Sequence, residues 1–307
     1  MFVVCGEALF DVFATGETPT GMAMDARIGG SPFNVALGLA RLGQPVAFLS
    51  RVSRGFLGER LMRALAAEGV DTSTVQRSDE PTTLSLIGLD AQGVPSYAFY
   101  GEGCADRRLD ASALEALPVG VKAINFGSYA TVVGTTAATQ RSLVERVQGR
   151  ALVAYDPNIR LNVEPRLEVW RKQIEWMLPR TQLLKVSDED LRLVWPGLEP
   201  AAFAARALAQ GVKLVVVTRG GEGASGWTAS AQVDTAPVKV AVVDTVGAGD
   251  TFQAALLTWL AEHGALAAPT LAALPADALA PALGFAARAA AITCSRRGAD
   301  MPRRADL

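Results

Sequence analysis

The sequence predicts an α/β fold in which one mostly parallel sheet is covered by helices. Short β-rich runs alternate with amphipathic helical runs, a pattern typical of parallel sheets built from β-α-β units. Half of the 307 residues are hydrophobic and a fifth are charged, which suits a globular protein with a sizeable core. This length allows one large domain, or a large domain with a small appendage.

The elements of the main sheet and its helices follow in order. Strands are expected near residues 2–5, 46–50, 121–125, 151–155, 182–186 and 213–218. Helices are expected near residues 32–42, 57–68, 134–148, 188–195, 200–210, 248–263 and 279–294. The helix at 32–42 has clear boundary signals, because Ser31 can cap it, Pro32 suits its first turn and Gly43 can end it.

Two β-rich segments interrupt this order. Residues 82–90 and 95–100 are β-runs joined by a turn that contains a glycine, which predicts a hairpin, and residues 8–14 also resemble a strand. These pieces could form a small sheet that projects from the main domain, a common form for a lid. They could equally extend an edge of the main sheet as antiparallel strands.

Composition excludes several classes of protein. A net charge of -2 gives no general attraction for nucleic acid or an acidic membrane, and no apolar run is long enough to span a bilayer. The first residues lack the basic start of a signal peptide, and the three scattered cysteines indicate reduced thiols in a cytoplasmic protein. Chemistry that depends on histidine is disfavoured, because His263 is the only one and lies where a helix should end.

The strongest motif is AVVDTVGAGDTF at residues 241–252, where an apolar β-run ends at Asp244 and a turn of small residues leads into a helix. Such a turn leaves backbone N–H groups free beside the positive end of the helix dipole, which makes an anion site. Asp250 could merely stabilise the helix start. A carboxylate beside a phosphate-binding turn is also what a kinase needs to accept a proton from an attacking hydroxyl, and the open glycine turn favours this second interpretation.

A second glycine motif is misleading. GEGASG at residues 221–226 matches the dinucleotide-binding pattern GxGxxG and follows an apolar strand. A true fingerprint opens a helix, whereas the residues that follow here alternate as strands do and include Pro237. This context argues against a dehydrogenase, and the absence of GxxxxGK[ST] from the sequence excludes a P-loop kinase.

The motif DTVGAGD resembles the C-terminal signature of the ribokinase-like (pfkB-type) carbohydrate kinases. GGSPFNVALGLARLG at 29–43, VTRGGEGA at 217–224 and RAAAITCSRRGA at 288–299 resemble further segments of this family in the same order. The resemblance implies a Rossmann-type three-layer α/β domain over residues 1–307, with a small β-sheet lid from segments at about 9–28 and 82–105. It also implies that ATP and Mg²⁺ serve to phosphorylate an alcohol of a sugar.

The resemblance assigns roles to individual residues. Asp250 is expected to be the catalytic base, beside an anion hole made by the backbone of Gly247, Ala248 and Gly249. Sugar-binding positions are expected at Asp11, Gly30, Asn34 and Arg160, and Arg160 could instead contact the γ-phosphate. A turn residue, a helix-surface amide and a surface arginine are the plain alternatives for Asp11, Asn34 and Arg160. Nucleotide-site positions are expected at Lys185, Ser187, Thr218, Gly220, Gly223 and Gly298.

Metal positions are expected at Asp190, which would hold Mg²⁺ through water, and at Asp244, which would hold a monovalent cation such as K⁺. Ser187 and Asp190 stand where the family commonly has Asn and Glu, which puts the metal geometry in doubt; a capped helix start is the alternative there.

The substrate is also an expectation from the resemblance. GGSPFNVA, PSYAFY and ADRRL are most similar to the bacterial fructokinase branch, which implies D-fructose as substrate and fructose 6-phosphate as product. The alternatives are a 2-keto-3-deoxygluconate or riboside kinase, or a non-catalytic sugar-binding regulator on the same fold. We expect a homodimer that pairs through the hairpin at 82–100, with no nucleic-acid or membrane partner.

Overall fold

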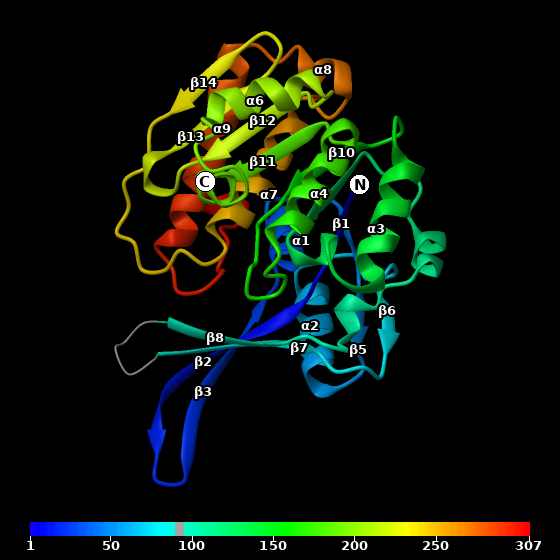
Figure 1. Ribbon diagram of the computed structural model, residues 1–307, viewed down its shortest axis with the longest axis vertical. Coiled ribbons are helices and arrows are strands. Elements are labelled where there is room, and N and C mark those ends of the chain that lie inside the picture. Colours follow the sequence, from blue (N-terminus) through cyan, green and yellow to red (C-terminus); the bar gives the residue numbers. More distant parts are fainter. Residues whose placement is uncertain (90–94) are drawn as a thin grey trace.

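The computed structural model describes residues 1–89 and 95–307. Its main sheet has eight strands in the order β14-β13-β12-β11-β10-β9-β1-β4 (Figure 1). The bounds are β1 Phe2–Cys5, β4 Val46–Leu49, β9 Ala123–Gly127, β10 Leu152–Asp156, β11 Leu183–Ser187, β12 Leu214–Thr218, β13 Ala224–Trp227 and β14 Gln232–Thr235. All neighbours from β12 to β4 pair in parallel, and β13 and β14 continue the sheet as antiparallel strands.

Helices cover both faces of this sheet and make a three-layer domain. The α-helices are α1 Ser31–Arg41, α2 Phe56–Ala67, α3 Gly134–Val147, α4 Leu167–Met177, α5 Asp188–Val194, α6 Pro200–Ala209, α7 Ala248–Glu262, α8 Ala268–Ala272 and α9 Ala276–Cys294. Phe2 and Val4 of β1 point into a core shared with α1, α7 and α9, whereas Val3 and Cys5 point into the core under α3, α4 and α6. A strand buried on both faces must be apolar at every position, which is why these strands are continuous hydrophobic runs.

The expected strands and helices of the main domain are present within a few residues. Two helices were missed, the short α8 and the longer α4. The i, i+4 and i+7 spacing of the buried Trp170, Ile174 and Met177 signals α4. Two expectations were wrong. Residues 241–244 form no strand, and α1 is capped by Gly30 rather than Ser31. Gly30 has φ 106° and lets the chain turn sharply into the helix, so Ser31 becomes the first helical residue.

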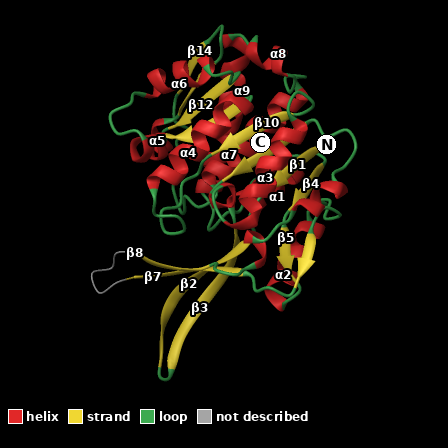
Figure 2. Cartoon of the chain, turned by 45° about the vertical axis from the view of Figure 1, so that its right-hand side comes forward, coloured by secondary structure: helices red, strands yellow, loops and turns green. Residues whose placement is uncertain are grey.

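The interrupting β-segments form a sheet of their own rather than an edge of the main sheet. Its order is β3-β2-β7-β8, with β2 Leu9–Thr18, β3 Gly21–Gly29, β7 Thr83–Leu89 and β8 Pro95–Tyr100. Figures 1 and 2 show this sheet projecting from the body of the molecule. The turn expected between β7 and β8 lies outside the described residues.

Two short strands complete the structure beside α2. They are β5 Arg51–Ser53 and β6 Gln76–Ser78, which pair in parallel. In the part of the chain that the structure describes, no helix has both the length and the apolar character needed to cross a membrane.

Candidate active site

Asp250 lies in the first turn of α7 and is buried, with 7% of its surface exposed. The Ser31 hydroxyl donates to its Oδ1 at 2.6 Å, and the Asn34 amide donates to its Oδ2 at 2.8 Å. Burial raises the pKa of the Asp250 carboxyl, and the two hydrogen bonds oppose this rise. The starts of α1 and α7 therefore meet at one buried carboxylate whose two oxygens are both oriented.

The turn before Asp250, which we call the anion turn (Gly247 to Gly249), has free backbone donors. Gly247 caps α7 with φ 78°, and a Cβ added there would lie 2.6 Å from Cβ of Ala299, so this position requires glycine. Among residues 1–89 and 95–307, no acceptor meets the N–H groups of Gly247, Gly249 or Asp250. The N–H of Ala248, which was expected to join them, instead donates to the Thr245 carbonyl at 3.2 Å. Free N–H groups at a helix start provide an anion site.

A buried ion pair lies next to this turn. Lys185 Nζ donates to Asp156 Oδ2 at 2.6 Å, and both side chains are almost fully buried. A Cβ added at Gly249 would be 3.4 Å from the same Nζ, which places the lysine beside the anion turn. Lys185 was an expected nucleotide-site residue, whereas Asp156 was missed. Its position at the end of an apolar strand was the available signal.

Asp190 and Arg160 lie at the neighbouring strand ends. The Ile159 N–H donates to Asp190 Oδ1 at 3.1 Å, and the Asp190 N–H donates to the Ser187 hydroxyl at 3.0 Å. Burial, and then repulsion by Asp156, raises the pKa of Asp190 to about 6. Arg160 is exposed, and its charge acts on the carboxyl groups of Asp190, Asp11 and Glu7. The structure therefore places Arg160 within reach of the site.

Asp11, on β2, faces the same site from the second sheet. Burial is the main cause that raises the pKa of the Asp11 carboxyl, and the charge of Asp250 raises this pKa further. A hydrogen bond with Ser85 and the charge of Arg160 act in the opposite direction. A Cβ added at Gly29 would lie 2.3 Å from Asp11 Oδ2, so the glycine leaves room for this carboxylate. Asn34 is not the surface amide of the plain alternative, because it is buried and holds Asp250.

The expected nucleotide-site residues lie along one end of the sheet. Thr218 ends β12, and Gly220 and Gly223 follow it with φ 51° and 91°. Gly298 donates its N–H to Asp244 Oδ2 at 2.8 Å, and Val246 donates to Asp244 Oδ1 at 3.1 Å. Asp244 thus connects the loop before α7 to the loop after α9, although no strand precedes it.

A further buried acid that was not expected is Glu7. Glu7 follows β1, is 1% exposed, and its Oε2 has no hydrogen-bond partner among the described residues. Burial raises the pKa of Glu7 to about 8, and the charge of Asp106 adds to this rise. A hydrogen bond from Ser128 and the charge of Arg160 oppose the rise. Asp106 accepts hydrogen bonds from Thr83 of β7 and from Tyr129 after β9. The start of β7 in the second sheet is therefore connected to the main domain by hydrogen bonds beside Glu7.

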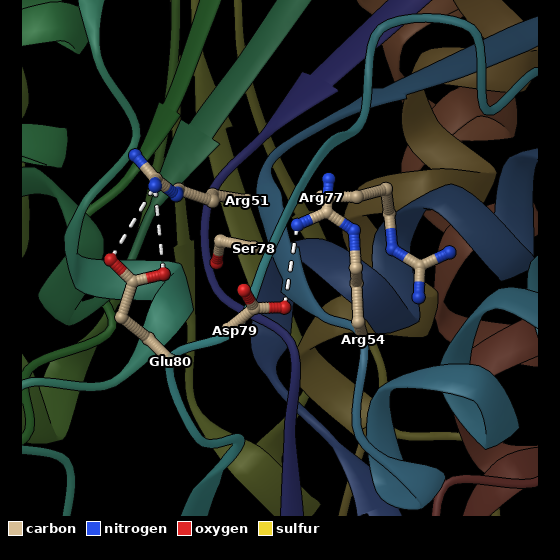
Figure 3. A pocket seen from close by; sticks show the side chains of 6 residues that line it. All are labelled: Arg51, Arg54, Arg77, Ser78, Asp79 and Glu80. Atoms are coloured by element: carbon tan, nitrogen blue, oxygen red, sulfur yellow. Dashed lines mark hydrogen bonds and ion pairs between the residues drawn. The ribbon is translucent and has the colours of Figure 1, made fainter.

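A surface hollow of about 470 Å³ lies elsewhere, at β5, β6 and the loops that follow them, and its lining includes Arg51, Arg54 and Arg77 (Figure 3). Their guanidinium groups point in different directions, and each has its own acidic partner: Glu80, Asp79 and Glu59 respectively. Because the three charges diverge and are paired, this hollow does not form a converging anion site.

Comparison with known proteins shows which family this chain matches. The model of the pfkB family carbohydrate kinases matches residues 1–305. A fructokinase from Rhizobium leguminosarum bv. trifolii is 36% identical over 281 residues, which cover 91% of this chain and 85% of that protein. Fructokinase-2 from Solanum lycopersicum is 30% identical over 276 residues, which cover 88% of this chain and 82% of that protein.

A solved structure agrees in fold along the whole chain. The fructokinase from Xylella fastidiosa with bound ATP superposes with a TM-score of 0.88 at 27% identity, covering 99% of this chain and 96% of that one. The likeness therefore includes the main sheet, its helices and the projecting sheet.

Proposed function

The chain belongs to the pfkB family of carbohydrate kinases and phosphorylates a sugar with ATP, and we propose that the sugar is D-fructose and the acceptor its 6-hydroxyl. The observation that carries this proposal is the match to fructokinases over most of both chains. The geometry around Asp250 supports it, since a buried and oriented carboxylate adjoins an anion turn.

Asp250 would act as the general base. The bond from the sugar oxygen to the terminal phosphorus forms as the bond from that phosphorus to the ADP oxygen breaks, and the hydroxyl proton passes to Asp250. Ser31 and Asn34 hold both carboxylate oxygens, so the base is fixed before the sugar arrives. Burial raises its pKa, which makes it a better proton acceptor than an exposed aspartate.

The anion turn and Lys185 would stabilise the negative charge of the phosphoryl group during its transfer. The free N–H groups of Gly247 and Gly249 can donate to the moving phosphoryl oxygens, and Lys185 Nζ lies next to Gly249. Asp11, Gly30 and Arg160 would bind the sugar, while Asn34 acts through Asp250. Ser187, Thr218, Gly220, Gly223 and Gly298 would border the nucleotide.

The acidic residues near Lys185 fit magnesium bound mainly by ATP. The described residues hold no group of three His, Cys, Asp or Glu side chains that could bind a metal alone. Mg²⁺ usually keeps several waters and takes one or two carboxylates together with phosphates. Asp190 would serve through water, since its repulsion with Asp156 is relieved by a nearby cation. When bound, the ion neutralises charge on the ATP phosphates.

A monovalent cation such as K⁺ would act at Asp244. This carboxylate already joins the loop of the anion turn to the Gly298 loop, so a cation there could order both without touching the sugar. We expect faster turnover in K⁺ than in tetramethylammonium at equal ionic strength. Equal rates in Na⁺, K⁺ and tetramethylammonium would contradict this part of the proposal.

A neutral sugar fits the site better than an acidic one. Asp11 would repel a carboxylate, and an uncompensated charge in a closed site costs several kcal/mol. The test compares kcat/KM for fructose and for 2-keto-3-deoxygluconate with the same ATP and Mg²⁺, by ADP release, alongside ribosides. Preference for the acidic sugar would reject fructose as the substrate and leave the sugar kinase activity standing.

A non-catalytic regulator on the same fold is disfavoured. Burying a carboxylate costs free energy, and a protein that only binds sugar has no need of a base at Asp250. We further propose that the enzyme works as a homodimer and in the cytoplasm. Cys5, Cys104 and Cys294 are all free thiols, which supports a reducing compartment.

A further inference from the structure

Arg27 is the only basic residue in the four strands of the projecting sheet. It pairs across the β2–β3 ladder with Asp11, so the two side chains share one face. The charges of Asp250 and Arg160 act on Asp11, which shows that this face is turned toward the active site. Arg27 is therefore a cation on the face of the projecting sheet that is turned toward the site. Kinases commonly use such elements as lids.

The side chain of Arg27 is held so that one end stays free. Its guanidinium lies over the ring of Phe13, 5.4 Å from the centroid, and its Nε and Nη2 atoms donate to Asp25 at 2.8 and 2.5 Å. No acceptor among the described residues meets Nη1. Two of the donor positions are thus used to aim the group, and the third remains available.

The free end points at the loop that supports the anion turn. Nη1 is 3.4 Å from where a Cβ on Gly298 would lie. The next residue, Ala299, fills the space beside Gly247. One dipeptide, Gly298–Ala299, thus separates the Arg27 guanidinium from the turn where the phosphoryl group is expected.

A further cation suits the charge balance of the site. Asp250, Asp156, Asp190, Asp11 and Asp244 bring five carboxyl groups to the region. Lys185 is paired with Asp156, and Arg27 is paired with Asp25 but keeps its Nη1 donors without an acceptor among the described residues. A transferring phosphoryl group adds negative charge, and phosphoryl-transfer enzymes commonly stabilise that charge with an arginine. The charge of Arg160 also acts on Asp11 and Asp190, and this arginine could contact either the sugar or the γ-phosphate.

We propose that Nη1 of Arg27 binds the phosphoryl group during its transfer, so that the projecting sheet supplies a catalytic cation as well as a cover. The inference rests on the proposed kinase site, with Asp250 as base and Gly247 to Gly249 as anion turn. It holds whichever sugar is the substrate, since it concerns only the group that moves.

The test uses Arg27→Met, which keeps an aliphatic stem over Phe13 but removes the charge and donors. Arg54→Met, on an exposed arginine of the surface hollow, is the matched control. Steady-state kcat and KM are measured with the best wild-type sugar, and calorimetry compares the binding of ADP alone with that of ADP plus aluminium fluoride, which mimics a transferring phosphoryl group. Removing one preorganised donor typically lowers kcat by about 10²–10³-fold.

We expect Arg27→Met to lower kcat by at least about 10-fold with little change in the sugar KM, and to abolish the gain in ADP affinity that aluminium fluoride gives the wild type. Arg54→Met should match the wild type. An unchanged kcat, or a lower kcat with the aluminium fluoride gain intact, would overturn the proposal and reduce Arg27 to a structural contact with the Gly298 loop. A wild type that phosphorylates no sugar would instead reject the proposed function, and the calorimetry would still decide whether Arg27 binds the mimic.

Discussion

Single residues of this site follow a common rule: carboxyl groups are buried and given hydrogen-bond partners rather than left in water. Asp250, Asp11, Asp190 and Glu7 all have raised pKa values, and burial is the first cause in each case. Raised pKa values in a cluster are typical of functional sites, because the same burial that costs stability tunes proton affinity. The two residues with the clearest consequences are Asp250 and Glu7.

Replacing Asp250 by Asn should remove catalysis and keep the fold. The amide is nearly isosteric, and the Ser31 hydroxyl can turn to accept from it, but an amide cannot take the proton. Loss of a general base lowers the rate by about 10²–10⁴-fold. The measurement is kcat beside a circular dichroism spectrum.

Asp277→Asn is the control for this change, because Asp277 also lies in the first turn of a helix but is exposed. If Asp250 only stabilised a helix start, the two variants would behave alike. A folded Asp250→Asn enzyme with near wild-type turnover would remove Asp250 from the role of base.

Replacing Glu7 by Gln should stabilise the protein at alkaline pH. The pKa of Glu7 is raised from 4.5 to about 8, so between these values the folded chain holds a proton that the unfolded chain releases. Stability from this group is therefore present at low pH and is lost as the pH rises toward 8. Gln never ionises. The melting temperature of the Glu7→Gln protein should therefore fall less than that of the wild type between pH 6 and pH 9.

The exposed residue Glu115, replaced by Gln, is the control for this pH series. Parallel pH profiles of the wild type and Glu7→Gln would show that Glu7 does not ionise in this range.

Sequence reasoning found Asp250 because a glycine turn and an acid are adjacent in the chain. It did not find Ser31 as a partner of Asp250, because a serine before Pro32 has the pattern of a helix cap. Asp156 was missed for a similar reason, since its partner Lys185 lies on another strand. Contacts between residues far apart in the sequence depend on the packing of α1 against α7 and of β10 against β11, which local patterns do not encode.

At the scale of elements, the turn from β3 into α1 connects the projecting sheet to Asp250, the proposed catalytic base. Gly29 gives room to Asp11, Gly30 caps α1, and Ser31 and Asn34 hold Asp250. Four residues of one motif thus connect the expected sugar site with the carboxylate of Asp250. The motif was recognisable from the sequence, whereas the reason for each residue type required the structure.

Gly29→Ala should weaken sugar binding through this turn. The new Cβ would lie 2.3 Å from Asp11 Oδ2, so the carboxylate must move. A misplacement of about 1 Å can cost about 10²-fold in rate, and we expect roughly a 10- to 100-fold loss in kcat/KM, mainly through the sugar KM. Gly88→Ala in β7 is the matched control, because nothing lies within 4 Å of its added Cβ. Equal kcat/KM in both variants would show that Asp11 does not position the sugar.

The strands and helices of the main domain were predictable because continuous apolar runs alternate with amphipathic helical runs in this sequence. The segment before the anion turn was not, because its valines resemble a strand although Val242 and Val243 are 64% and 61% exposed. No strand in the described part of the chain pairs with residues 241–244, and an apolar run without a pairing partner cannot become a sheet strand.

At the scale of the whole molecule, the site forms where the parallel strands end. Glu7 follows β1, Ser128 follows β9, Asp156 ends β10, Lys185 is in β11 and Thr218 ends β12. Ligand crevices of α/β proteins lie at this edge, and the projecting sheet reaches over it from β2 and β3. One topology thus explains why residues from the whole length of the chain share one site.

The projecting sheet also suggests how two molecules would assemble. Within residues 1–89 and 95–307, its edge strands, β3 and β8, each pair on one side only. Met22, Met24, Tyr97 and Tyr100 on these strands are 56%, 50%, 58% and 59% exposed. Open edges with large apolar side chains invite pairing with another chain, and a small sheet is marginally stable without a partner surface.

We therefore expect a homodimer held by the projecting sheets at micromolar concentration, measured by light scattering after size exclusion. Met24→Lys combined with Tyr100→Lys should convert it to a monomer, because charges would replace apolar contacts at the open edges. Val119→Lys, at a fully exposed valine outside this sheet, is the control and should leave the dimer intact. A wild type that is strictly monomeric, or a dimer that persists in the double variant, would show that these edges do not make the interface.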